Sequence, residues 1–213
     1  MKLETAIHNA FINLKNSNIK SALIDSELLM ASVIKKSREY IVLNLNKEIT
    51  KKDYNNFKDM INQRSEGKPI AYIVNKKSFW KHEFFVNKHV LIPRPDTEIV
   101  IEQVLQIFKN KNKINFLDIG FGSGCILLSI LKERGDFKAI GVDKSNRALK
   151  VCKFNANKLG VKTRLKLYNS DIDKFSLGKY DLIISNPPYI KNLDLKYLDK
   201  DVIKFEPKLA LDG

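Results

Sequence analysis

Four residues near the end of the chain combine a side-chain amide, two prolines and an aromatic ring: Asn186-Pro187-Pro188-Tyr189. They follow the hydrophobic run Tyr180–Ser185, which is typical of a buried strand. Proline has no backbone N–H and a fixed φ, so the turn is stiff and its carbonyl groups are free to accept hydrogen bonds. Two acceptors and a flat ring suit a planar –NH2 group. We therefore predict that these four residues bind a planar –NH2 group of a substrate. Asn186, Pro187 and Tyr189 are predicted to take part in the reaction at its nitrogen.

A second motif joins a predicted strand to a predicted helix, and it reads Asp118-Ile119-Gly120-Phe121-Gly122-Ser123-Gly124, with the glycine motif at residues 120–124. Glycines let a ligand approach the backbone closely, and the N-terminus of the following helix offers unpaired N–H groups to a negatively charged group. A nicotinamide fingerprint would place its third glycine at Cys125, so the spacing argues against NAD. The alternative for these glycines is a purely structural tight turn.

Two further strand ends carry acidic residues. Asp143 ends the second predicted strand of this region, where a carboxylate can accept hydrogen bonds from both hydroxyls of a ribose. Asp171 and Ile172 end the third, where an acid can take an adenine amino group and an apolar residue can cover its ring. The alternatives are an exposed acid for Asp143 and a cap for Asp171. The predicted cofactor site consists of the glycine motif, these three residues and Asn186.

The elements that position these motifs fall into three parts. Residues 1–68 show apolar positions at helical spacing and predict a helical domain. Residues 69–93 predict a β-hairpin linker, with strands at Ile70–Val74 and Phe84–Val86. Residues 94–213 alternate strands and helices, which predicts an α/β, Rossmann-like, doubly wound parallel sheet. The predicted strands are Ile114–Asp118, Lys138–Asp143, Arg164–Tyr168 and Tyr180–Ser185, and the helices between them are 123–134 and 145–159.

Glycine loop, ribose acid, adenine-binding strand end and Asn-Pro-Pro-Tyr, in that order, resemble a class I S-adenosylmethionine-dependent methyltransferase. Other stretches resemble the HemK/PrmC family of release-factor glutamine methyltransferases: Arg64–Ile73, Phe79, Leu91–Glu98 and Phe205–Leu211. The resemblance implies S-adenosylmethionine as cofactor and N5-methylation of the glutamine in the Gly-Gly-Gln loop of class 1 peptide chain release factors. It also implies that the helical domain helps to dock that protein substrate.

The resemblance further implies C-terminal strands that do not occur before Gly213. We therefore expect a sheet truncated after its fourth strand, in the order third, second, first, fourth. The fourth strand would lie at an exposed edge, which favours self-association or cover by the C-terminal segment. Such a chain is expected to keep its cofactor contacts and to catalyse poorly.

The composition limits the other function classes. The net charge of +14 indicates either compositional drift or a polyanionic partner, and only six of the 38 basic residues are Arg, the residue that base-specific contacts favour. Nucleic acid is therefore not expected as the direct substrate. A DNA-adenine or rRNA-guanine N-methyltransferase remains the alternative enzyme, and a non-catalytic fragment that binds the cofactor or the release factor is the non-enzymatic alternative.

Cysteine and histidine usage and hydropathy also bear on the class of protein. Two cysteines without a CxxC motif and three histidines make a metal site unexpected. No apolar run approaches the length of a membrane span, and the N-terminus does not resemble a signal peptide. We therefore expect a cytoplasmic protein with reduced cysteines, no metal and no membrane partner.

Overall fold

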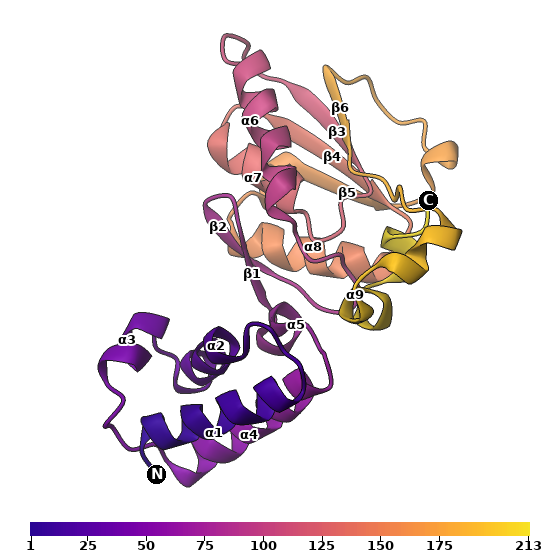
Figure 1. Cartoon of the computed structure of the whole chain (residues 1–213). Coiled ribbons are helices and arrows are strands. Elements are labelled where there is room, and N and C mark those ends of the chain that lie inside the picture. Colours follow the sequence, from indigo (N-terminus) through magenta and orange to yellow (C-terminus); the bar gives the residue numbers. More distant parts are fainter. The chain divides into compact units, whose positions relative to one another are not determined.

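A computed structural model describes the backbone of residues 1–213 and every side chain except those of Asn192 and Leu195. The chain forms two compact units, Met1–Val74 and Asn75–Gly213 (Figure 1). The first unit is helical, and the second contains a two-stranded hairpin and a four-stranded parallel sheet.

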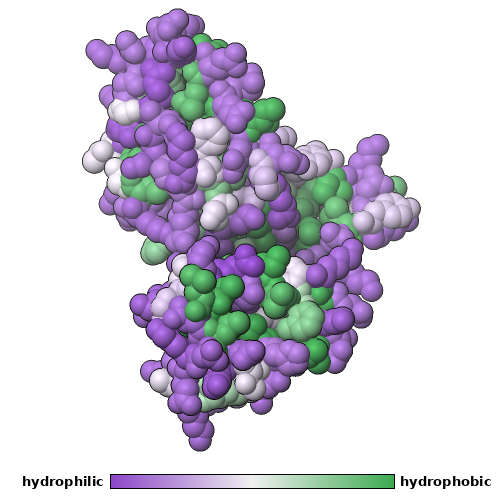
Figure 2. Space-filling model, turned by 60° about the vertical axis from the view of Figure 1, so that its left-hand side comes forward, coloured by the Kyte–Doolittle hydropathy of each residue, from purple (hydrophilic) through white to green (hydrophobic). Residues whose placement is uncertain are grey.

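The helical unit contains α1 (Leu3–Asn16), α2 (Ala22–Ile34), α3 (Arg38–Leu43), α4 (Lys51–Ser65) and α5 (Ile70–Val74). Apolar residues at helical spacing form a single core, which includes Leu3, Leu14, Leu29, Met30, Ile41, Phe57 and Ile61. The prediction of helices in this region is confirmed. On the face shown in Figure 2, hydrophobic side chains gather on this unit among mostly hydrophilic ones. Its large exposed apolar residues include Leu23, Ile24, Leu28, Val42 and Leu43.

The prediction that Ile70–Val74 is a strand is wrong, because this segment is the short helix α5. The N–H groups of Tyr72 and Ile73 both donate to the carbonyl of Pro69, at 2.9 and 3.2 Å. Proline suits the start of a helix, since its missing N–H costs nothing there. A short apolar run is buried equally well as a strand or as a helix, so its periodicity could not distinguish the two.

The hairpin therefore begins later than predicted. Its strands are β1 (Lys76–Phe79) and β2 (His82–Phe85), which pair in antiparallel orientation with Lys76 opposite Phe85. The tight turn lies at Trp80, whose φ is 54°. The Trp80 indole N–H donates to the Glu133 carboxylate at 2.8 Å. This bond connects the hairpin to the rest of the second unit, which we call the sheet unit.

The main sheet contains β3 (Asn115–Ile119), β4 (Lys138–Asp143), β5 (Leu165–Asn169) and β6 (Leu182–Ser185). All neighbouring strands are parallel, in the order β5-β4-β3-β6. The predicted fold class and strand order are thus confirmed. Among the strands that the structure describes, β6 lies at one edge, and Ile183 in it is 59% exposed.

Four helices accompany this sheet in the described structure: α6 (Glu98–Ile107), α7 (Cys125–Glu133), α8 (Asn146–Lys158) and α9 (Lys200–Phe205). The core between the sheet and these helices contains fully buried Phe116, Leu127 and Phe137. Because all strands run in one direction, their carboxyl ends meet at one edge, where parallel sheets bind ligands.

None of the helices in the described part of the chain combines the length and apolar composition that a membrane span needs. Within the same residues, His, Cys, Asp and Glu side chains do not form a group of three or more that could hold a metal ion.

Candidate functional site

A cavity of about 370 Å³ opens at the carboxyl ends of the strands. This volume lies in the range of small-molecule and cofactor sites. Its wall brings together most of the residues that the sequence predicts for the site: Gly120, Phe121, Gly122, Ser123, Asp143, Ile172, Asn186, Pro187 and Pro188. Three predicted site residues do not line it, namely Gly124, Asp171 and Tyr189.

The glycine loop offers its backbone to the cavity at two positions. Gly120 and Gly122 have φ values of 76° and 53°, and a Cβ atom at either would meet nothing within 4 Å. The N–H of Gly120 donates to the Val142 carbonyl at 2.8 Å, and Asn155 donates a side-chain N–H to the Ser123 carbonyl at 2.9 Å. These two hydrogen bonds hold the backbone of the loop, while the space beside Gly120 and Gly122 stays open.

Gly124 does not line the cavity, and close packing explains why it is a glycine. It is the N-cap of α7 with a φ of 80°, and a Cβ atom there would lie 2.6 Å from Cys152 Sγ and 2.9 Å from Leu128 Cδ1. Glycine is therefore needed at this position because α7 and α8 pack closely against it.

Asp143 connects the end of β4 to the glycine loop. One carboxylate oxygen accepts the N–H of Gly122 at 2.9 Å, and the other accepts the N–H of Ser145 at 2.8 Å. Burial raises the pKa of this carboxyl group, and the two backbone hydrogen bonds act in the opposite direction. Carboxylate oxygens have further lone pairs, so Asp143 can still accept hydrogen bonds from a ligand in the cavity.

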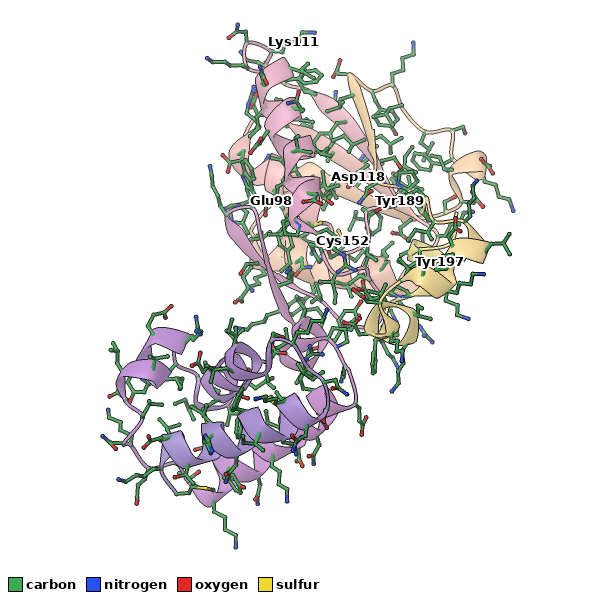
Figure 3. The ribbon with its side chains drawn as sticks, viewed as in Figure 1. Glu98, Lys111, Asp118, Cys152, Tyr189 and Tyr197 are labelled. Carbon is green, nitrogen blue, oxygen red and sulfur yellow. The ribbon has the colours of Figure 1, made fainter. Side chains whose placement is uncertain are left out.

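Asp118 is the first residue of the second motif, and its sequence position alone assigns it no role in the site. It lies at the end of β3, lines the cavity and is only 2% exposed (Figure 3). Its Oδ2 atom has no hydrogen-bond partner in the described structure. Burial, together with the charge of Asp143, raises the pKa of Asp118 to about 7. The available signal was its position, since an acid directly before a glycine loop must point into the site or into the core.

The raised pKa of Asp118 predicts a pH-dependent stability. Between about pH 4 and pH 7 the folded chain keeps a proton that the unfolded chain releases, so the free energy of unfolding falls as the pH rises. The contribution is up to about 1.4 kcal/mol per pH unit for one proton. We expect Asp118→Asn to remove this slope in urea denaturation measured from pH 4.5 to pH 7. Parallel profiles for the two proteins would show that Asp118 does not keep its proton.

The third strand end differs from the prediction. The carboxylate of Asp171 forms an ion pair with Lys144 at 3.0 Å and accepts the N–H of Asp173 at 3.2 Å, so it caps a short 3-10 turn. Its neighbours Ser170 and Ile172 line the cavity instead. In this structure Asp171 therefore shows its alternative, capping role, while Ile172 lies where an apolar cover was expected.

The Asn-Pro-Pro-Tyr motif follows β6 directly and lies beside the glycine loop. Ser185, the last residue of β6, pairs with Ile119 of β3, and its hydroxyl donates to the Ile119 carbonyl at 3.1 Å. Asn186, Pro187 and Pro188 line the cavity. Tyr189 is 80% exposed, in the segment that follows β6 (Figure 3). The motif thus supplies acceptor groups to the cavity and an aromatic ring to the surface next to it.

Two family models match the chain: the PrmC N-terminal domain at residues 5–74 and the methyltransferase small domain at residues 97–204. A protein of Caulobacter vibrioides is 37% identical over 94% of this chain and 70% of its own length. One of Clostridium acetobutylicum is 38% identical, over 100% of this chain and 76% of its own length. One of Leptospira interrogans is 41% identical, over 93% and 71%. All three are named release factor glutamine methyltransferase.

Proposed function

Because the chain belongs to the family of release factor glutamine methyltransferases, we propose that it methylates a glutamine side chain of a peptide chain release factor with S-adenosylmethionine. The acceptor is the N5 nitrogen of the glutamine in the Gly-Gly-Gln loop of class 1 release factors. The observation that carries this proposal is one cavity lined by both the glycine loop and Asn186-Pro187-Pro188. The proposed substrate places the reaction in the cytoplasm, where release factors act.

The residues of the cavity fit S-adenosylmethionine. The open space before Gly120 and Gly122 admits a ligand against the backbone, and Asp143 suits the ribose hydroxyls. The unpaired Oδ2 of buried Asp118 suits a cationic amino group, since a buried carboxylate needs a partner. Ile172 offers an apolar contact to the adenine ring. When bound, the cofactor supplies an electrophilic methyl group on a sulfonium sulfur.

The residues of the chain contribute to methyl transfer mainly by positioning the acceptor. An amide nitrogen is a weak nucleophile because its lone pair is delocalised, so holding it in line for attack is the main contribution that the protein can make. Asn186 Oδ1 and the Pro187 carbonyl accept the two amide protons and orient the nitrogen. Tyr189 is exposed and is therefore available to stack on the amide of a protein substrate that covers it. As the new N–C bond forms, the bond between the methyl carbon and the sulfonium sulfur would break and its electron pair would stay on the sulfur as a neutral thioether. The methylated nitrogen then loses one proton to solvent.

The proposed role of Asp143 can be tested on cofactor binding alone. We expect Asp143→Ala to weaken the binding of S-adenosylmethionine at least about tenfold, because hydrogen bonds to a charged group contribute about 1.5–3 kcal/mol each. Isothermal titration calorimetry measures the change. Asp59→Ala is the control, since Asp59 is an exposed acid of α4. Unchanged affinity of the Asp143 variant would exclude this carboxylate from the cofactor site.

The experiment that tests the proposed function measures transfer of a tritiated methyl group to a purified release factor. Two substrates are compared, one with Gln and one with Ala in the Gly-Gly-Gln loop. We expect label in the first and none in the second. Equal labelling of both, or label in duplex DNA or rRNA in place of the release factor, would contradict the proposal.

A further inference from the structure

Two segments that the proposed function does not use also form part of the cavity wall. Residues 91–97 contribute Leu91, Pro93, Arg94 and Thr97, and residues 207–212 contribute Pro207, Leu209, Ala210 and Asp212. Both segments belong to stretches that carry the family resemblance. They are more than a hundred positions apart in the chain, so a specific contact must hold them on the same cavity.

Glu206 makes that contact. Its side chain is only 2% exposed, and its two carboxylate oxygens bind two different groups of the first segment. Oε1 pairs with the guanidinium of Arg94 at 2.5 Å, and Oε2 accepts the N–H of Ile92 at 3.0 Å. A buried carboxylate is costly unless it is paired and hydrogen-bonded. The Glu206 side chain thus holds both the backbone at Ile92 and the guanidinium of Arg94.

The segment that follows Glu206 is attached to the residue after the Asn-Pro-Pro-Tyr motif. The N–H of Ile190 donates to the Leu211 carbonyl at 3.2 Å, and the N–H of Gly213 donates back to the Ile190 carbonyl at 3.1 Å. Between Glu206 and Leu211 the chain forms the compact turn Lys208–Ala210. The N–H of Ala210 donates to the Pro207 carbonyl, and that of Leu211 donates to the Lys208 carbonyl, both at 2.9 Å. Glu206 and Ile190 are therefore joined through a short, ordered segment.

This attachment is important because the motif has little other support. The ladder between β3 and β6 ends at Ser185, and Asn186 and Pro187 are exposed. In the described structure, the backbone hydrogen bonds of residues 186–190 outside the strands are those between Ile190 and the C-terminal segment. The motif is thus held by β6 at one end and by the segment that Glu206 anchors at the other.

We propose that the ion pair between Arg94 and Glu206 positions the substrate nitrogen that receives the methyl group. On the basis of the proposed function, the pair fixes the carbonyls of Asn186 and Pro187 through residues 207–211 and Ile190. Glu206 itself does not line the cavity, whereas Arg94 does. When the substrate nitrogen is displaced by a fraction of its distance from the methyl carbon, the rate of methyl transfer falls far more than the affinity for the cofactor. The pair therefore acts on methyl transfer more strongly than on cofactor binding.

Glu206→Gln tests the pair with the shape of the side chain preserved. We expect kcat for methyl transfer to fall at least about tenfold and the Kd of S-adenosylmethionine to change less than about twofold. Arg94→Gln should cause a similar loss, the double variant should be no worse than either single variant, and Arg94→Lys should recover part of the rate. Parallel losses of rate and cofactor affinity, or additive losses in the double variant, would overturn the proposal.

Glu133→Gln is the matched control. Glu133 also accepts from one cation, Lys81, and one neutral N–H, that of the Trp80 indole, both at 2.8 Å, and it does not line the cavity. Glu133→Gln therefore removes the same negative charge as Glu206→Gln, at a residue outside the cavity wall. We expect kcat to stay within about twofold of the unsubstituted chain, which separates positioning from a general effect of losing a carboxylate.

A second measurement does not depend on the proposed function. Hydrogen exchange of the Ile190 amide, which donates to Leu211, should become at least about fivefold faster in Glu206→Gln, while the Leu117 amide in β3 stays protected. If the exchange rate of the Ile190 amide is unchanged in Glu206→Gln, the proposal that the pair positions the motif is refuted, whatever the enzyme activity. Faster exchange at Ile190 in a protein that does not methylate a release factor would refute the proposed function and leave the attachment of the motif established.

Discussion

Replacing Asn186 with alanine is expected to lower kcat/KM for the release factor at least about a hundredfold. The variant loses the side-chain carbonyl that accepts one of the two amide protons, so the acceptor nitrogen is no longer aimed at the methyl group. Binding of S-adenosylmethionine should survive within about threefold, because the glycine loop, Asp118 and Asp143 lie on the other strand ends and are unchanged.

Two measurements on the same protein test this expectation. Methyl transfer is followed with a tritiated methyl group, and cofactor affinity is followed by calorimetry. Asn112→Ala is the control, since Asn112 is an exposed residue of the loop before β3. If Asn186→Ala loses cofactor binding in proportion to its rate, the division into acceptor residues and cofactor residues is wrong.

Replacing Gly124 with alanine is expected to destabilise the sheet unit by about 2–5 kcal/mol. A left-handed residue with a side chain costs about 1–2 kcal/mol, and forcing a methyl group into a packed site costs about 1–3 kcal/mol more. The clash is unavoidable because the new Cβ would lie 2.6 Å from Cys152 Sγ and 2.9 Å from Leu128 Cδ1. Urea denaturation followed by circular dichroism measures the loss.

Gly160→Ala separates the two contributions. Gly160 has a similar φ of 70°, but a Cβ atom there would meet nothing within 4 Å. We therefore expect a loss of only about 1–2 kcal/mol, from backbone strain alone. Equal losses at Gly124 and Gly160 would mean that α7 can move away from Cys152 and that packing contributes little.

The sheet could be predicted from the sequence because each of its strands is signalled locally. Apolar runs separated by helix-length segments indicate parallel strands, while the order of the strands follows from the family resemblance. The predicted ends differ from the observed ones by at most two residues, as in β3 (Asn115–Ile119). Ile70–Val74 was predicted as a strand because five apolar residues carry no period. Only the folded chain, in which Ala71, Tyr72 and Ile73 are buried, distinguishes the helix from a strand.

The site could be predicted in part for the same reason. Strand ends of a parallel sheet converge on one edge, so Gly120, Asp143 and Asn186 were expected together, and all three line one cavity. Asp171 does not line this cavity, and its partner Lys144 could not be predicted because it comes from the loop after another strand. Asp118 was missed because its unusual pKa arises from burial and from Asp143, which no local pattern reveals.

The motifs can be recognised without the fold: a glycine loop, acids at strand ends and an Asn-Pro-Pro-Tyr turn each follow from the backbone preferences of neighbouring residues. The tertiary structure alone decided which groups meet across long separations in the chain. It places Glu206 against Arg94, Cys152 against Gly124 and the Leu211 carbonyl against the Ile190 N–H. Such contacts depend on how whole elements pack, and packing is a property of the folded chain and not of any short segment.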